Sequence, residues 1–415
     1  MPNIKLCQQI GSLLNNENAC KLILHFIIGV VVTLILVLTK LYFETRPLGH
    51  RVEVLTYEFL NSQIPAFSPE VKMPVVVLDI SKIPGGKSGT VTSREILKEI
   101  IIELINQKAR AIAIDIDFSP DESGWIDKKD PKFFEFCLEQ RQNGTPILLG
   151  VYRTAMQKPS NWLGSEDFKD LAAGIIINVK DVSRMPVWIQ KNEEQKLFTL
   201  SSALVKAAKL EAKEPPQLLK FILEEPNHSE IVDTKGDIKI SSLIMNFSKL
   251  EFIHSQSLSA ISTNSIEDLG DKFRDKLVII GDGTFGEATD TFIVPGRDKP
   301  VPGIYLHASA VYTQTTEPFY ELNHLSKLVI DISLGILILL IITIIRWRNT
   351  AKNIDWEKTQ KRFIWLAIIF CFIIGIIAVR VLSILWLDFI LVIFALFLHP
   401  TVEKGITNIF KINSH

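Results

Sequence analysis

Aspartate residues follow two apolar runs of the sequence that have the length of buried strands. Asp115 and Asp117 come at the end of the run AIAIDIDF, and Asp282 directly follows the run KLVIIG. Because open α/β sheets bind ligands at the carboxyl ends of their strands, we expect Asp115 and Asp282 to converge at such an edge with Asp79, which ends a third apolar run. They could bind Mg²⁺ and support phosphoryl transfer, or they could cap helices and accept hydrogen bonds from loop amides.

The spacing of these carboxylates is similar in part to that of haloacid-dehalogenase-like phosphatases. In that family a strand-end Asp-x-Asp supplies the nucleophile and the acid/base, and a later Gly-Asp-Gly-x-x-Asp helps to hold magnesium. Here the residue two after Asp117 is Ser119, where Thr or Val is usual, and the position four after Asp282 is Gly286. A magnesium-dependent phosphatase therefore stays an alternative, and the main prediction is a protein with no catalytic residues and no cofactor.

A glycine-rich motif, GDGTFG at residues 281–286, also follows an expected strand and matches the dinucleotide pattern GxGxxG. The residues after it, EATDTFIVPG, include Thr, Asp, Pro and Gly where a phosphate-binding helix should begin. No further strand–helix–strand unit follows, since a long apolar run begins at Leu328. We therefore expect no dinucleotide site.

The histidines and cysteines show no spacing typical of a metal site, so we predict no metal. One of the four cysteines, Cys137, falls in the long polar middle of the chain, which therefore cannot hold an internal disulfide. His307 lies in the segment PGIYLHASAV, which predicts a helix that starts near Pro302. We interpret it as an interior or domain-edge histidine with satisfied hydrogen bonds, in preference to a metal ligand.

The strands and helices expected around these residues indicate an α/β domain. The apolar run PVVVLDIS at 74–81 predicts a strand that ends near Asp79, and Thr92 with Glu95 predicts a capping box at the start of a helix. Together with a second strand over 111–118 they form a strand–helix–strand unit with parallel strands. Further strands are expected over 146–151, 174–179 and 276–281, and a helix over 200–212.

Apolar segments predict that the chain also crosses a membrane. The first run, at 22–39, has roughly 18 residues, enough to cross a hydrocarbon core of about 30 Å. A second run covers 328–345. A third, 363–398, would measure about 54 Å as one helix and has Arg380 and Asp388 near its middle, so it favours a hairpin of two crossings.

Basic residues predict the orientation of these crossings. The segment RWRNTAKNIDWEKTQKR, at 346–362, carries six Lys or Arg and is expected in the cytoplasm under the positive-inside rule. Counting from it places the N-terminus and the C-terminal tail inside and the long polar middle outside. The near-zero net charge of −1 gives no reason to expect nucleic-acid binding.

The predicted fold class is α/β: a mostly parallel-sheet extracytoplasmic domain inserted between one N-terminal and three C-terminal transmembrane helices. The expected parts are a cytoplasmic N-terminus (1–21), a transmembrane anchor (22–41), the extracytoplasmic domain (42–325), a transmembrane helix (326–345), a basic cytoplasmic loop (346–362), a transmembrane hairpin (363–399) and a cytoplasmic tail (400–415).

In order and spacing, several segments resemble the type-two CHASE domain, an extracytoplasmic sensory domain associated with cyclases and with histidine and serine/threonine kinases. The resemblance covers nearly the whole chain, including one anchor helix before the domain and three crossings after it. One departure is the segment GTVTSR, which stands where the family usually has a Trp-Pro stretch. The residues that carry the resemblance, and that it implies as ligand-binding, are Asp79, Arg94, Asp115, Asp117, Asn246, Asp282, Asp290 and His307.

The resemblance implies a multi-pass sensor of a bacterial inner membrane that binds an unidentified extracytoplasmic ligand. Family members commonly continue into a kinase or cyclase, whereas the cytoplasmic parts expected here are too short to fold such a domain. We therefore expect the signal to pass to a separate cytoplasmic effector, and a homodimer stays open. The other alternative is a membrane scaffold that senses nothing.

Overall fold

The computed structural model describes residues 26–27, 29–31, 33–35, 37–39, 42, 72–87, 89–119, 125–152, 169–175, 182–191, 196–223, 229–231, 238–260, 269–285, 290–351 and 356–385. The chain divides into two compact units. One unit comprises 58–218 and 225–320, and the other comprises 1–57, 219–224 and 321–415.

The first unit contains a six-stranded sheet whose paired strands all run parallel, in the order β4-β3-β2-β10-β1-β9. Four of its strands are continuous apolar runs with almost every residue buried, as expected for a parallel sheet covered on both faces. The strands are β1 (Val75–Asp79), β2 (Ala111–Ile114), β3 (Ile147–Val151), β4 (Ala172–Gly174), β9 (Leu258–Ser259) and β10 (Leu277–Gly281).

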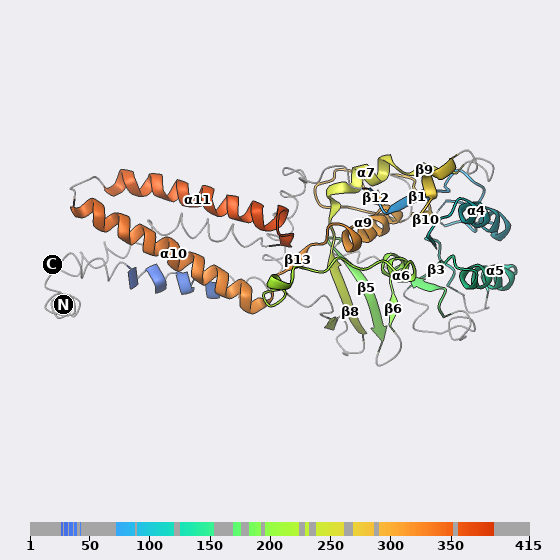
Figure 1. Ribbon diagram of the computed structural model, residues 1–415, viewed down its shortest axis with the longest axis horizontal. Helices are drawn as coiled ribbons and strands as arrows, with labels where there is room; N and C mark the ends of the chain where they lie inside the picture. The colour runs from blue at the N-terminus through green and yellow to red at the C-terminus, as the bar shows by residue number, and fades with distance from the viewer. Residues whose placement is uncertain are drawn as a thin grey trace. The chain divides into compact units, whose positions relative to one another are not determined.

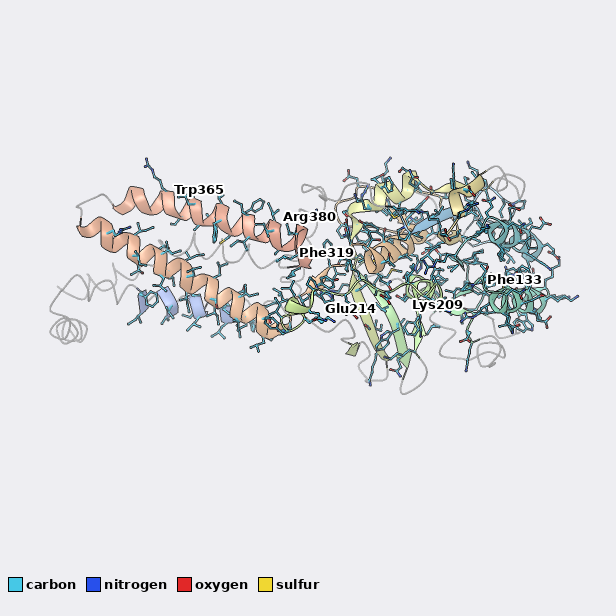
Figure 2. The ribbon with its side chains drawn as sticks, viewed as in Figure 1. Phe133, Lys209, Glu214, Phe319, Trp365 and Arg380 are labelled. Carbon is cyan, nitrogen blue, oxygen red and sulfur yellow. The ribbon has the colours of Figure 1, made fainter. Side chains whose placement is uncertain are left out.

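Helices cover both faces of this sheet. Helices α4 (Arg94–Asn106) and α5 (Asp130–Gln142) lie on one face, and α6 (Leu200–Ala207) and α9 (Gly303–Thr315) lie on the other (Figure 1). On α5, Phe133 stacks on Phe118 with the ring centroids 5.8 Å apart and helps to close the core on that side (Figure 2). The unit is therefore a three-layer α/β/α domain, which confirms the predicted fold class for this part of the chain.

The order of the strands was not evident from the sequence. β1 and β2 run parallel and are joined through α4, as expected, but β10 lies between them and pairs with both. Of the strand expected over 174–179, Gly174 is the last residue of β4, and residues 176–179 lie outside the described residues. Residues 115–118, expected to continue β2, leave the strand after Ile114.

The predicted capping box at the start of α4 is wrong. The N-cap residue is Ser93, and its side chain makes no capping hydrogen bond. The Thr92 hydroxyl instead donates to the carbonyl of Gly85, 2.6 Å away, and Glu95 pairs with Lys129. Gly85 has a φ of 74°, in the left-handed region that favours glycine, so Thr92 fixes the PGG loop after β1.

A second sheet in this unit was missed by the sequence analysis. It is four-stranded and antiparallel, in the order β6-β5-β8-β7, with a register irregularity between Pro186 and Trp188. Its strands are β5 (Arg184–Lys191), β6 (Leu197–Phe198), β7 (Ser229–Ile231) and β8 (Ile238–Ile244). Shorter elements are η2 (Gln217–Leu219), η3 (Phe247–Lys249), α7 (Leu250–Ser255), η4 (Gly270–Phe273), β11 (Thr291–Phe292), β12 (Val301–Pro302) and β13 (Tyr320–Glu321).

The second unit is formed by long apolar helices. Helix α10 (His324–Ala351) contains one segment, His324–Ile345, that is long and apolar enough to cross a membrane; α11 (Trp356–Arg380) includes the shorter apolar stretch Ile364–Arg380. A helical stretch near the N-terminus packs closely on α10. A Cβ added at Gly29 would lie 2.6 Å from Leu339 Cδ2, and one added at Gly335 would lie 2.6 Å from Thr33 Cγ2.

The segment expected to be a basic loop over 346–362 is largely helical. Helix α10 continues to Ala351 and α11 begins at Trp356, and residues 352–355 lie outside the described residues. Helix α11 ends at Arg380, and β14 (Ile384–Leu385) follows. The expected fourth crossing also lies outside the described residues.

Candidate functional site

The register of the parallel sheet brings three strand-end aspartates to one edge. Asp79 at the end of β1 pairs with Gly281 at the end of β10, and Asp282 follows directly. The backbone amide of Asp115, after β2, donates to the carbonyl of Ile280 at 2.7 Å. The three residues therefore follow neighbouring strands at the same level, as the sequence predicted. We call Asp79, Asp115, Asp282, Asp290 and His307 the carboxylate edge.

Asp79 holds the loop after β10 against the end of β1. Its Oδ1 accepts hydrogen bonds from the amides of Ser81 and Gly283, each 2.9 Å away. Gly283 approaches so closely that an added Cβ would lie 2.9 Å from Asp79 Cγ. One carboxylate oxygen of Asp79 is thus used structurally, and Oδ2 has no hydrogen bond within the described residues.

Asp115 is the most desolvated carboxylate of the group. Its side chain is 6% exposed, and burial, followed by the charge of Asp290, raises its pKa well above the ordinary value. Gly281 permits this position, because an added Cβ would lie 3.1 Å from Asp115 Cβ. The environment therefore favours the neutral, protonated form of Asp115.

His307 lies opposite Asp115 on α9. The residue is 1% exposed, neither ring nitrogen has a hydrogen-bond partner among the described residues, and Nε2 lies 3.8 Å from Asp115 Oδ1. Burial lowers the pKa of His307 to about 3, so the ring is neutral near pH 7. The expectation of a hydrogen-bonded interior histidine is wrong on this point: the residue is interior, but its nitrogens are unsatisfied, which is costly for buried polar groups.

Asp290 and Asp282 complete the carboxylate edge. Asp282 Oδ1 accepts from the amide of Thr284 at 2.9 Å, and burial followed by the charge of Asp282 raises the pKa of Asp290. The carbonyl of Asp290 accepts from the amide of Gly303, 3.0 Å away, and a Cβ at Gly303 would lie 2.4 Å from Asp290 Oδ2. Asp290 therefore lies at the N-terminus of α9, where the helix dipole favours a negative charge.

Three aromatic side chains beside the carboxylate edge were missed by the sequence analysis. The rings of His254, Phe285 and Tyr305 have centroids 4.6, 5.2 and 5.4 Å apart in pairs. The Tyr305 hydroxyl would lie 3.0 Å from a Cβ at Gly283, the glycine that also contacts Asp79. Burial, followed by the charges of Asp79 and Asp282, raises the pKa of Tyr305. No local spacing indicated this cluster, because its members come from three separate segments.

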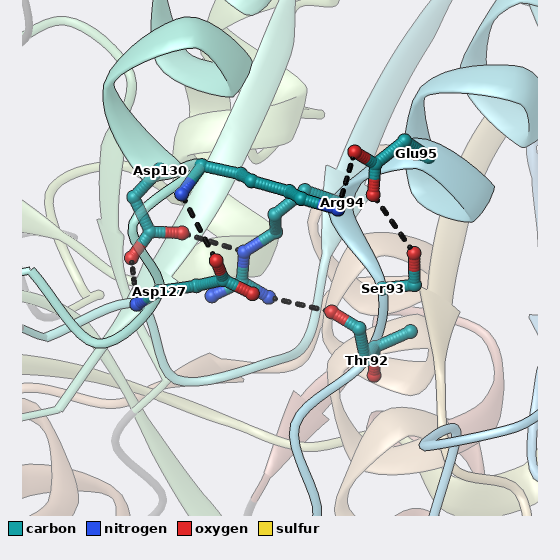
Figure 3. A network of polar contacts seen from close by, with 7 residues as sticks. Thr92, Ser93, Arg94, Glu95, Asp127 and Asp130 are labelled. Atoms are coloured by element: carbon teal, nitrogen blue, oxygen red, sulfur yellow. Dashed lines mark hydrogen bonds and ion pairs between the residues drawn. The ribbon is translucent and has the colours of Figure 1, made fainter.

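Arg94 does not belong to the carboxylate edge. Its Nε forms a buried ion pair with Asp130 Oδ1 at 2.5 Å, and its Nη1 donates to the carbonyl of Thr92 (Figure 3). The guanidinium also lies 4.5 Å from the ring centroid of Phe118. These contacts tie the start of α4 to the start of α5, so the structure gives Arg94 a structural role.

Asn246 and Asp117 also have structural contacts. Asn246 caps η3 through the amide of Ser248 and bonds the carbonyl of Glu317 beyond the C-terminal end of α9, whereas the carboxylate edge meets the other end of that helix. Asp117 Oδ1 accepts from the amides of Ser119 and Tyr152, at 2.8 and 3.2 Å. The structure thus brings five of the eight expected residues together and assigns the other three to loop and helix connections.

The arrangement does not favour the phosphatase alternative. A neutral, buried Asp115 is a poor nucleophile, since a carboxylate attacks through its ionised form. Within the part of the chain that the structure describes, no three carboxylate, imidazole or thiol groups converge so that they could hold a metal ion. What the carboxylate edge offers is negative charge, an unsatisfied imidazole and adjacent aromatic rings.

The chain combines an α/β/α domain that has a carboxylate edge with a later helix that is long and apolar enough to cross a membrane. The family model of the CHASE2 domain matches residues 28–345, which is most of the chain. The chain therefore belongs to the CHASE2 domain family, a family of sensory domains, as the resemblance predicted. No curated protein and no solved structure matches it.

Proposed function

We propose that this protein is a multi-pass membrane sensor whose α/β domain lies outside the cytoplasm and whose signal passes to a separate cytoplasmic effector. The observation that carries the proposal is the CHASE2 match, which includes both the α/β domain and the apolar helix α10. The carboxylate edge is the proposed ligand site, because open α/β sheets bind ligands at the carboxyl ends of their strands.

The chain connects the proposed ligand site to the membrane helices by a short path. Helix α9, which carries Tyr305 and His307, ends at Thr315, and α10 begins at His324. A ligand that favours one position of α9 would shift the population of the arrangements of α10, because only residues 316–323 separate the two helices. The basic segment 346–362 and the tail 400–415 would present the result to the effector.

The exposed side chains of the second unit support a membrane location. Helices α10 and α11 expose many large apolar residues, among them Trp365, which is 59% exposed (Figure 2). Exposed apolar surface of this extent is rare on a domain in water and is normal for helices that face lipid. The close approach at Gly29 and Gly335 is the small-residue packing that membrane helices use.

Locking the N-terminal stretch to α10 tests the relay. Gly29→Cys and Leu339→Cys, in a background with the four native cysteines replaced by alanine, should form a disulfide because these positions are in contact. If the helices move during signalling, the oxidised protein in native membranes should capture a different set of cytoplasmic partners from the reduced protein. The same partners in both states would instead favour the non-sensing scaffold.

A further inference from the structure

Three aspartates of the carboxylate edge lack a basic partner among the described residues. Within the described residues, no lysine or arginine forms an ion pair with Asp79, Asp115 or Asp290. The ion-pair distance that Asp115 does have is the 3.8 Å to His307, whose ring is neutral. A buried carboxylate is normally paired with a cation or a metal, and Asp115, whose side chain is 6% exposed, has neither among the described residues.

His307 is an independent observation that points to a ligand at the same place. It is 1% exposed, both ring nitrogens lack a partner in the part of the chain that the structure describes, and Nε2 lies 3.8 Å from Asp115 Oδ1. A buried, neutral imidazole has one nitrogen that can accept a hydrogen bond. A ligand whose N–H groups reach both side chains from one side would donate to the imidazole and to the carboxylate of Asp115.

The adjacent aromatic rings indicate an organic cation. Phe285 is 39% exposed and packs against His254 and Tyr305, and Tyr305 lies beside Gly283 and Asp79. Aromatic faces next to carboxylates attract alkylammonium groups through the ring quadrupole. A divalent metal fits less well, because no three potential metal ligands converge within the described residues.

We propose that the carboxylate edge binds a small organic cation with N–H donors, such as a primary ammonium compound, and that Asp115 releases its proton as the cation binds. The proposal rests on the proposed sensor function and names the class of its ligand. The proton passes from the Asp115 carboxyl group to solvent, and the cation replaces it as the positive partner. No bond other than this O–H bond changes.

Proton release makes the binding depend on pH. The elements around Asp115 carry further titratable groups, which are Asp79 from β1, Asp282 after β10, Asp290 before β11, Tyr305 and His307 from α9, His254 from α7 and Lys206 from α6. The ammonium group of Lys206 lies over the ring of Phe198. Because the pKa of Asp115 is raised, the free protein must lose this proton to bind the cation. Affinity should therefore increase with pH up to that raised pKa.

Calorimetric titration of the full-length protein in detergent tests the proposal, with ethanolamine and putrescine as probes. At least one probe should bind, with release of about one proton detected by comparing buffers of different ionisation enthalpy. Tetramethylammonium, which has the charge without N–H donors, and Mg²⁺ should bind at least about tenfold more weakly, since neither can donate to His307. Equal binding of all four would overturn the proposal, as would the absence of binding by both amines.

Variants locate the site. Asp115→Asn should weaken amine binding at least about tenfold and abolish its pH dependence, and Phe285→Leu, at an exposed position, should weaken it several-fold. Asp298→Asn removes the same charge from an exposed residue and should bind as the wild type does. If Asp115→Asn does not fold, His307→Gln and Phe285→Leu decide the question, and unchanged affinity in both contradicts the site. The disulfide between positions 29 and 339 tests the movement of the helices without any amine. A failure of amine binding would therefore contradict the ligand class proposed here and leave the sensor function to be judged by the disulfide experiment.

Discussion

Asp115 is buried in its protonated form, which water disfavours near pH 7, and His307 is buried with no hydrogen-bond partner for its ring among the described residues. Each residue therefore stores a free-energy cost in the folded domain, because both groups would be solvated if the domain opened. Such costs persist when the surrounding structure fixes the residues, and they occur often at binding sites. A bound ligand that supplied hydrogen-bond or charge partners to Asp115 and His307 would reduce this cost.

The pH dependence of stability should reveal this pair. Asp115 has a raised pKa in the folded state, so it destabilises the fold increasingly as pH rises above its ordinary value of 3.8. His307 has a pKa lowered to about 3, so it destabilises the fold increasingly as pH falls below 6.5. Each effect amounts to about 1.4 kcal/mol per pH unit, and the two oppose each other between those values.

Substitution separates the two effects. Relative to the wild type, the Tm of Asp115→Asn should increase as pH is raised from 4 towards 8, and the Tm of His307→Gln should increase as pH is lowered from 6.5 towards 4. Thermal unfolding followed by tryptophan fluorescence measures both. If the plots of Tm against pH for both variants run parallel to that of the wild type, the pKa values of Asp115 and His307 are not shifted by folding as the structure indicates.

Two helices are joined at their N-terminal ends by the buried pair of Arg94 on α4 and Asp130 on α5. Both side chains are almost fully buried, at 3% and 1% exposed. An exposed pair, Lys129 with Glu95, joins the same two helices nearby (Figure 3). The resemblance implied Arg94 as a ligand-binding residue, and its partner could not be read from the sequence because Asp130 lies 36 residues away.

Asp130→Asn should destabilise the domain by about 3–5 kcal/mol, because it leaves the Arg94 charge buried and uncompensated. Glu95→Gln is the control, and it should leave the thermal unfolding temperature unchanged, since solvent screens the exposed pair. Amine binding by Asp130→Asn below its unfolding temperature should remain that of the wild type. A stable variant that fails to bind would instead place Arg94 in the ligand site.

Local pattern predicted the elements of the sheet better than their arrangement. Runs such as VVVLD and LVIIG are apolar because both faces of the sheet are covered, so their strands could be located in the sequence. The insertion of β10 between β1 and β2 depends on pairing between residues far apart in the chain, which no local spacing reveals. The antiparallel strand β8, IKISSLI, alternates weakly and lacks such a run.

The same limit applies to the site. Asp79, Asp115 and Asp282 were predicted to converge because each follows a strand, and a strand end is a local feature. Asp290 and His307 came from the family resemblance. The aromatic residues His254, Phe285 and Tyr305 could not be predicted, because three separate segments must fold before their rings meet.

For the molecule as a whole, the account requires the α/β domain and the basic segment to lie on opposite sides of a membrane. The CHASE2 match, the apolar helix His324–Ile345 and the six basic residues of 346–362 all support that placement. A sensor of external conditions needs its carboxylate edge in contact with the outside and its effector surface in contact with the cytoplasm.

Labelling with a membrane-impermeant maleimide tests this placement most directly. Asp298→Cys, in the α/β domain, and Arg348→Cys, in the basic segment, are both at exposed positions. In intact spheroplasts of cells that express the cysteine-free background, the account predicts labelling of Asp298→Cys at once and of Arg348→Cys only after lysis. Labelling of Arg348→Cys from outside, with Asp298→Cys protected until lysis, would contradict the sensor.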